Sequence, residues 1–133
     1  MDEVGQAIQL ILQHRSDILA IYLFGSHGTP YENKESDLDI AILPLHPFDS
    51  LQRWQLAQEV AYAIHRDVDL IDLTQASTVL RFQIIGLGKR VFCSNPFASD
   101  LFETTTYSAY VRFNDERREL LDAIKKRGRI LNG

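Results

Sequence analysis

The sequence predicts an α/β fold, in which a small mixed β-sheet is flanked by helices and followed by a C-terminal helical tail. Two observations lead to this prediction. Short apolar runs of strand length alternate with longer segments whose apolar residues recur at helical spacing. After residue 96 the helical pattern continues without a further strand. We therefore expect a domain over residues 1–96 and a helical extension over residues 97–133, packed on the domain, on a partner, or on both.

The chain opens with an amphipathic helix and a first strand. Apolar residues recur at i, i+3, i+4, i+7 and i+8 from Val4 to Leu12, and the positive charge near His14 and Arg15 suits the end of a helix. The run from Ile18 to Phe24 is rich in Ile, Leu and aromatic residues and stops at a glycine. This pattern is typical of a buried strand that ends at a turn.

Two further predicted strands carry acidic residues and are separated by a helix. The strands extend from Asp37 to Leu43 and from Val68 to Leu73. Between them, Asp49 or Ser50 can cap a helix from about Leu51 to Ile64. Its expected buried stripe is Ala57, Val60, Ala61 and Ile64. This helix is predicted to cross over between the two acidic strands.

The rest of the chain is predicted to be mostly helical. A helix from about Ser77 to Leu87, with Leu80, Ile84 and Leu87 on one face, precedes a short edge strand from Arg90 to Cys93. Pro96 is expected to break the chain, and Ser99 to Leu131 to form one long helix or two in line. Apolar side chains fall near helical spacing in this tail: Tyr107, Tyr110, Val111, Phe113, Leu120 and Ile124. We expect this stripe to pack on the domain. The alternative is a partner-binding surface, since the tail adds more aromatic area than a small core needs.

Composition limits the functions that this chain can have. It has 133 residues, of which 45% are hydrophobic and 24% charged, as expected for a soluble protein with one core. A formal net charge of −4 argues against a general nucleic-acid binder, which needs a basic surface. We find no membrane-spanning run and no signal-peptide pattern, so we expect a cytoplasmic protein. The only cysteine, Cys93, excludes an internal disulfide.

A Gly-Ser pair stands where the first strand leaves the sheet. If a helical turn follows Gly25, the free N–H groups of that turn and the Ser26 hydroxyl point at one place, which suits a phosphate. The alternative is that Gly25 only forms a turn and Ser26 caps the next helix. In the polar connection that follows, Lys34 could reach a phosphate or remain in solvent, and Ser36 could orient a carboxylate or cap the loop.

Two aspartates in the second strand suggest a metal site. Asp37 and Asp39 are two residues apart, so both project from the same face of a strand. Adjacent carboxylates repel each other, and a hard cation such as Mg²⁺ would compensate them. If the third strand pairs alongside, about 4.8 Å away, Asp69 can join them. Carboxylates, two metal ions and a phosphate cradle form an arrangement known for displacement at phosphorus. The alternative places the aspartates of the second strand on an exposed edge.

The third strand offers three candidates for the last carboxylate. Asp67 and Asp69 share one face, and Asp72 points to the other. Asp67 lies at the mouth of the strand while Asp69 lies further in, so we choose Asp69. Asp72 is then predicted to be structural and to cap the turn into Thr74.

These residues resemble a known family. Gly25-Ser26, ten residues, Asp37-x-Asp39 and a later strand acid are similar to the DNA polymerase beta-type nucleotidyltransferase superfamily. Over about residues 4–93, the chain most resembles its minimal nucleotidyltransferases, in particular the MntA-type antitoxins paired with HEPN-domain ribonuclease toxins. The family strand whose first acid completes the catalytic triad matches Val68 to Leu73, which supports Asp69.

The resemblance implies an activity and a partner. The implied reaction is transfer of AMP from Mg-ATP to a tyrosine of a cognate HEPN toxin, which neutralises the toxin. Asp37, Asp39 and Asp69 would hold Mg²⁺, as two ions, while Gly25 and Ser26 would hold the triphosphate. Two alternatives stay open. One is a small-molecule nucleotidyltransferase of the aminoglycoside-modifying kind, although such enzymes add a sizeable helical domain that this chain lacks. The other is a non-catalytic antitoxin that acts by binding only.

Overall fold

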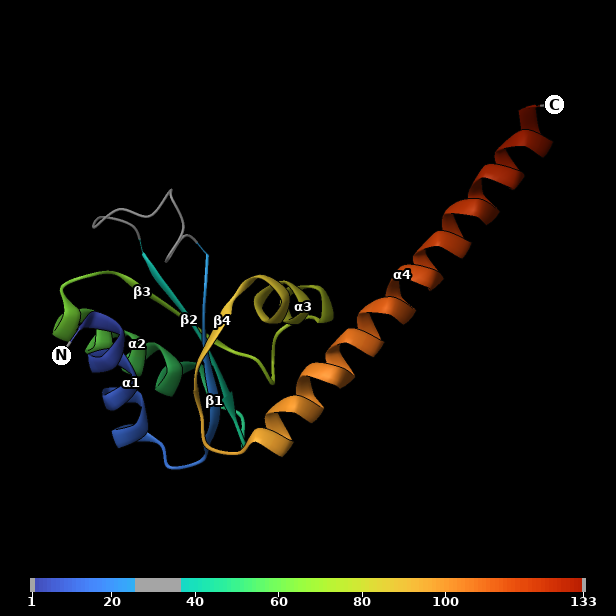
Figure 1. Ribbon diagram of the computed structural model, residues 1–133. Coiled ribbons are helices and arrows are strands. Elements are labelled where there is room, and N and C mark those ends of the chain that lie inside the picture. The colour runs from blue at the N-terminus through green and yellow to red at the C-terminus, as the bar shows by residue number, and fades with distance from the viewer. Residues whose placement is uncertain (1, 26–36, 133) are drawn as a thin grey trace.

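The computed structural model describes residues 2–25 and 37–132, with side chains as far as residue 128. Its elements are α1 (Glu3–His14), β1 (Ile18–Phe24), β2 (Leu38–Pro44), α2 (Ser50–Ile64), β3 (Val68–Asp72), α3 (Thr78–Leu87), β4 (Lys89–Cys93) and α4 (Pro96–Asn132). Helices α1 and α2 lie on one side of the sheet, and α3 and the start of α4 lie on the other (Figure 1). This three-layer arrangement confirms the predicted fold class.

Among the described residues, the four strands form one mixed sheet in the order β3-β2-β1-β4. Strand β1 is antiparallel to both β2 and β4, whereas β2 and β3 are parallel. A parallel pair needs a crossover connection, and α2 supplies it, as predicted. The two acidic strands are therefore neighbours in the sheet.

The two central strands, β1 and β2, are buried on both faces of the sheet, which explains why they are nearly continuous apolar runs. One face packs against α1 and α2 through a cluster that includes Ile11, Ile21, Ile40, Val60 and Leu70. The other face packs against α3 and the start of α4 through a cluster that includes Tyr22, Ala41, Leu43, Leu73 and Ile84. Successive residues of a strand thus contribute to opposite clusters.

Polar side chains cap the N-termini of α1, α2 and α3. Asp2, Asp49 and Ser77 accept hydrogen bonds from the backbone N–H groups of Gly5, Gln52 and Leu80, at 2.7, 2.7 and 3.2 Å. Asp49 is thus the cap of α2. In that helix Leu56 is buried beside three of the predicted stripe residues, while Ala61 is only half-buried.

Two predictions for the second half of the chain were wrong in detail. Leu87 is 89% exposed, and Ile85 is buried in its place. Pro96 does not break the chain but is the first residue of α4, where a missing N–H costs nothing because that position has no helical acceptor. The side chain of Asn95 accepts from Ala98 N at 3.0 Å and caps this helix.

The long helix α4 packs on the domain only over its first part. Tyr110 stacks on Phe82 of α3 with ring centroids 3.7 Å apart, and Tyr107 meets the same ring edge-on at 5.6 Å. Beyond these contacts α4 runs away from the domain (Figure 1), and Phe113, Leu120 and Ile124 are exposed. Packing of the whole stripe on the domain was therefore a wrong expectation. None of the helices that the structure describes is long and apolar enough to cross a membrane.

Candidate active site

Gly25 and Asp39 meet at the end of the antiparallel pair β1–β2. Phe24 is the register partner of Asp39, so the chain leaves β1 directly beside this carboxylate. Gly25 has φ +76°, and an ideal Cβ on it would lie 2.0 Å from Asp39 Oδ2. A residue with a side chain would be strained in this backbone conformation and would collide with the carboxylate. Ser26, Lys34 and Ser36 lie outside the described residues.

The parallel pair β2–β3 brings a second carboxylate beside the first. Asp39 and Asp69 are register partners. Asp39 is two residues from Ala41, and Asp69 is two residues from Ile71. Both Ala41 and Ile71 belong to the α3-facing cluster, so the two aspartate side chains project from that same face. Asp39 is half-buried and Asp69 is exposed. The strands thus place these two predicted site residues side by side.

Asp37 lies just outside β2 and is exposed. The next residue, Leu38, donates its N–H to the carbonyl of Asp67 at 2.9 Å, which fixes the beginning of β2 against the segment that leads into β3. Asp37 is therefore held at the same end of the sheet as Asp39 and Asp69.

The charges of Asp69 and Asp37 act on the carboxylate of Asp39. Burial, together with the negative charges of Asp69 and then Asp37, raises the pKa of Asp39 above its usual range. Each cause disfavours the ionised form of Asp39, either by removing water from it or by placing a like charge near it. A bound cation would relieve this unfavourable charge.

The donor chemistry of this group fits Mg²⁺, which prefers carboxylate oxygens together with phosphate oxygens and water. Within residues 2–25 and 37–132, however, no three Asp, Glu, His or Cys side chains are arranged so that they could hold a metal ion by themselves. A metal here therefore needs ligands from outside these side chains. Mg²⁺ commonly takes such ligands from substrate phosphates.

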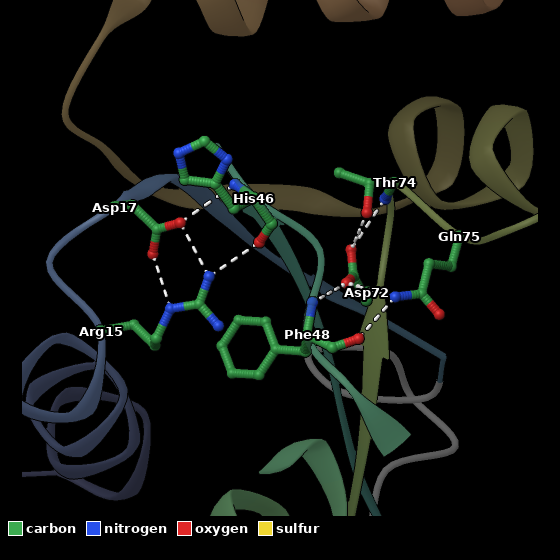
Figure 2. A network of polar contacts seen from close by, with 7 residues as sticks. All are labelled: Arg15, Asp17, His46, Phe48, Asp72, Thr74 and Gln75. Atoms are coloured by element: carbon green, nitrogen blue, oxygen red, sulfur yellow. Dashed lines mark hydrogen bonds and ion pairs between the residues drawn. The ribbon is translucent and has the colours of Figure 1, made fainter. Parts of the chain in front are cut away.

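Asp72 is separate from this group and has a structural role, as predicted. Its side chain is 4% exposed and accepts hydrogen bonds from Phe48 N at 2.9 Å, Thr74 N at 2.9 Å and Thr74 Oγ1 at 2.6 Å (Figure 2). Gln75 Nε2 donates to the same carboxylate at 3.3 Å and to the Phe48 carbonyl at 2.6 Å. Asp72 thereby fixes the end of β3 to the segment before α2.

A neighbouring cluster ties the end of α1 to the same segment. Arg15 donates from Nε and Nη2 to Asp17 at 2.8 Å each and from Nη2 to the His46 carbonyl at 2.7 Å (Figure 2). The guanidinium also lies 4.0 Å from the centre of the Phe48 ring. The hydrogen bond from Arg15 holds the pKa of Asp17 below its usual range. This cluster is on the face of the sheet opposite the site.

Sequence reasoning missed one polar group on the site face. Tyr22 is 1% exposed and donates its hydroxyl to Glu103 Oε1 at 3.2 Å. Burial is the main cause that raises the pKa of this phenol. Arg90 in turn contacts Asp100 at 3.0 Å and Glu103 at 3.2 Å, so the group joins α4 to β1 and β4. Residues so far apart in the chain carry no local signal of this contact.

A mixed sheet flanked by helices and followed by a long C-terminal helix is the fold of a nucleotidyltransferase. The family described as "Polymerase beta, Nucleotidyltransferase" matches residues 6–97. The chain therefore belongs to the polymerase beta nucleotidyltransferase family.

Individual relatives extend this assignment along the chain. The protein adenylyltransferase MntA of Shewanella oneidensis is 38% identical over 120 residues, covering 90% of this chain and 86% of that protein. A toxin–antitoxin crystal structure with AMP-PNP contains a chain with a TM-score of 0.82 and 36% identity, covering 93% of this chain and 98% of its own length. The MNT antitoxin structure in complex with the tri-AMPylated S. oneidensis HEPN toxin gives a TM-score of 0.78 and 36% identity, with coverage of 92% and 95%.

Proposed function

We propose that this chain is a protein adenylyltransferase that acts as an antitoxin. It transfers AMP from Mg-ATP to a tyrosine of a cognate HEPN ribonuclease toxin and thereby neutralises the toxin. The reaction operates in the cytoplasm, where its substrate ATP is available. The relatives support this assignment, since a protein adenylyltransferase and an antitoxin bound to an AMPylated HEPN toxin match nearly the whole chain.

One observation is the main support for the proposed chemistry. Asp39 has the carboxylate of Asp69 beside it in register and the backbone of Gly25 directly against it. A purely structural strand gains nothing from two adjacent carboxylates, because like charges opposite each other destabilise a sheet. A metal–phosphate site gains a binding group from each of them.

The chain's own residues have distinct roles in this mechanism. Asp37 and Asp39 would hold Mg²⁺, and Gly25 and Ser26 would bind the triphosphate. Asp69 would complete the metal ligands and accept the proton of the tyrosine hydroxyl. The tyrosine oxygen then bonds to the α-phosphorus while the bond from that phosphorus to the β-phosphate bridging oxygen breaks, so diphosphate leaves. When bound, Mg²⁺ neutralises phosphate charge and stabilises the leaving diphosphate.

The test is the intact mass of the cognate HEPN toxin, before and after incubation with the chain and Mg-ATP. We expect additions of whole AMP units, located on tyrosine by peptide fragmentation. Chelation of the metal should prevent them, as should the double substitution Asp37→Asn, Asp39→Asn. The substitution Asp67→Asn is the matched control, because this carboxyl is exposed and lies outside the strand pair. It should leave the transfer intact.

The same experiment separates the alternatives. A double variant that no longer modifies the toxin but still blocks its ribonuclease activity would indicate a binding-only antitoxin. A chain that leaves the toxin unmodified and releases diphosphate when small hydroxyl compounds are added would indicate a small-molecule nucleotidyltransferase. Transfer that persists in the double variant would contradict the assigned roles of Asp37 and Asp39.

A further inference from the structure

The last part of α4 has an apolar face that no described residue of the domain covers. Tyr110 is the last large apolar residue of this helix with a ring contact to the domain. Of the five large apolar side chains in the free segment, residues 111–128, all of them 42–61% exposed, four lie near one face of the helix. We refer to them as the tail stripe: Phe113, Leu120, Leu121 and Ile124.

The tail stripe continues the face through which α4 already packs. Phe113, Leu121 and Ile124 follow Tyr110 at spacings of 3, 11 and 14 residues, which keeps them near the same side of a helix. Tyr110 covers Phe82 of the domain. Beyond Tyr110, α4 runs away from the domain (Figure 1), so the continuation of the same side has no described part of the domain against it. A partner could thus extend the packing that α3 begins.

Exposure of the whole apolar face to water is unfavourable for such a helical segment. At a rise of about 1.5 Å per residue, its 18 residues span roughly 27 Å. Amphipathic helices derive most of their stability from packing of the apolar face, and isolated helices of this length are marginal in water. The tail stripe therefore has the properties of a surface that is covered in the working assembly.

The charges around the stripe distinguish between possible partners. Arg117 lies within it, and Lys125 and Arg127 flank it, with Glu116 as the acidic neighbour. Acidic residues gather instead on the opposite side of the helix: Asp115, Glu119 and Asp122. Two copies of the chain would therefore bring two basic rims together. A partner with acidic side chains around an apolar surface would be complementary.

We propose that the tail stripe docks on the acceptor protein itself, at an apolar helical surface bordered by Asp and Glu. The identity of this partner as the HEPN toxin rests on the proposed function. Matches of 92–93% of this chain to antitoxin chains from toxin–antitoxin complexes include most of α4, so this helix belongs to the shape they share. The docked helix holds the acceptor beside the domain while its tyrosine reaches Asp69.

The test measures the association and dissociation rates of the cognate HEPN toxin on a surface that carries the immobilised chain. Asp37→Asn and Asp39→Asn are present in every chain tested, so that no AMP is added during the measurement. On this background we compare the triple variant Leu120→Gln, Leu121→Gln, Ile124→Gln with the control Glu119→Gln, Lys126→Gln. Glutamine keeps helix propensity in both, and the control alters the opposite side without changing net charge. Circular dichroism of each full chain verifies that the tail stays helical.

We expect the triple variant to bind the toxin about 100-fold more weakly and the control to bind within about twofold of its parent. Arg117→Gln with Arg127→Gln should slow association mainly at low salt. Equal toxin affinity of the triple variant and its parent would overturn the inference. Sedimentation of a dimer of the chain alone, returned to monomer by the triple substitution, would also overturn it and assign the stripe to a second copy.

Failure of the inference is distinguishable from failure of the proposed function. In chains that retain Asp37 and Asp39, AMP transfer that survives the triple substitution at limiting toxin leaves the enzyme assignment in place and removes the docking role. Toxin binding that requires the stripe, with no AMP transfer by the wild type, would support the docking role and contradict the enzyme assignment.

Discussion

The backbone of Gly25 occupies the space directly beside the carboxylate of Asp39. An ideal Cβ on Gly25 would come within 2.0 Å of Asp39 Oδ2 and 2.9 Å of its Cγ, and the glycine has φ +76°. The turn that ends β1 and the acid of β2 thus fit together only if position 25 has no side chain. Gly25 therefore matters for the position of Asp39 as well as for the turn.

Replacement of Gly25 by alanine should abolish most of the activity. The new methyl group must displace the Asp39 carboxylate, and the left-handed backbone adds a strain of about 1–2 kcal/mol. We expect AMP transfer to the toxin to fall at least about 100-fold, because catalytic groups tolerate little misplacement. Initial rates by intact mass, together with urea unfolding, measure both effects.

Gly86 provides the matched control. It lies in α3, and an added Cβ would meet no atom within 4 Å. Alanine there should stabilise the helix by about 0.5–1 kcal/mol and leave transfer unchanged. If Gly25→Ala transferred AMP as fast as Gly86→Ala, the close contact with Asp39 would have no catalytic meaning.

The charge of Asp39 should make the metal-free chain less stable at neutral pH. Its pKa is raised by burial and by the charges of Asp69 and Asp37, so the folded state favours the protonated form. A raised carboxyl pKa contributes stability at low pH, and this contribution is lost as the pH rises from about 4 through the raised value. In a chelator, Asp39→Asn should therefore be more stable than the wild type at pH 8, by about 0.2–1 kcal/mol.

The pH dependence and the metal response are the specific readouts. Urea unfolding at several pH values should show the two proteins converging as the pH falls through the raised pKa of Asp39, because the wild-type carboxyl then becomes protonated. Addition of Mg²⁺ with a non-hydrolysable ATP analogue should then stabilise the wild type more than the variant. A variant that is less stable than the wild type at pH 8 without metal would contradict the electrostatic account.

Asp69 and Asp72 should respond to the same substitution in opposite ways. Asp72→Asn replaces an acceptor of four hydrogen bonds with a group that can accept at only one atom, and the site is buried. We expect a loss of about 1–3 kcal/mol in the free energy of unfolding, with transfer retained in the folded fraction. Asp69→Asn, at an exposed position, should abolish transfer without a loss of stability.

Urea unfolding and transfer rates at low temperature separate these two outcomes, with the exposed Asp67→Asn as the control for both. Transfer that survives Asp69→Asn but is lost in fully folded Asp72→Asn would show that Asp72, and not Asp69, acts in catalysis.

Much of the fold could be predicted because the sheet signals are local. The run from Ile18 to Phe24 matches β1 at both ends, and the acidic strands were found to within one residue. Parity along β3 was also enough to separate Asp69 from Asp72, since a strand alternates its faces. The pairing of Asp39 with Asp69 then follows from a parallel neighbour joined by one crossover helix.

Other features depend on contacts between distant parts of the chain, which sequence patterns do not specify. Nothing local indicates that Tyr22 donates to Glu103, or that Gly25 abuts Asp39 across the turn. The periodicity of the tail predicts an amphipathic helix but not what covers its apolar face. For this reason packing on the domain was expected for the whole stripe, although the contacts with Phe82 stop at Tyr110.

The two parts of α4 should differ in what they contribute to the stability of the chain alone. Tyr110→Ala removes a ring stacked on Phe82 at 3.7 Å, so we expect the free energy of unfolding to fall by about 1–2 kcal/mol. Phe113→Ala, one turn further along and 42% exposed, should change it by no more than about 0.5 kcal/mol. Urea unfolding without toxin compares the two directly. If Phe113→Ala were as costly as Tyr110→Ala, residues beyond Tyr110 would pack on the domain in solution, and the free segment would not be available to a partner.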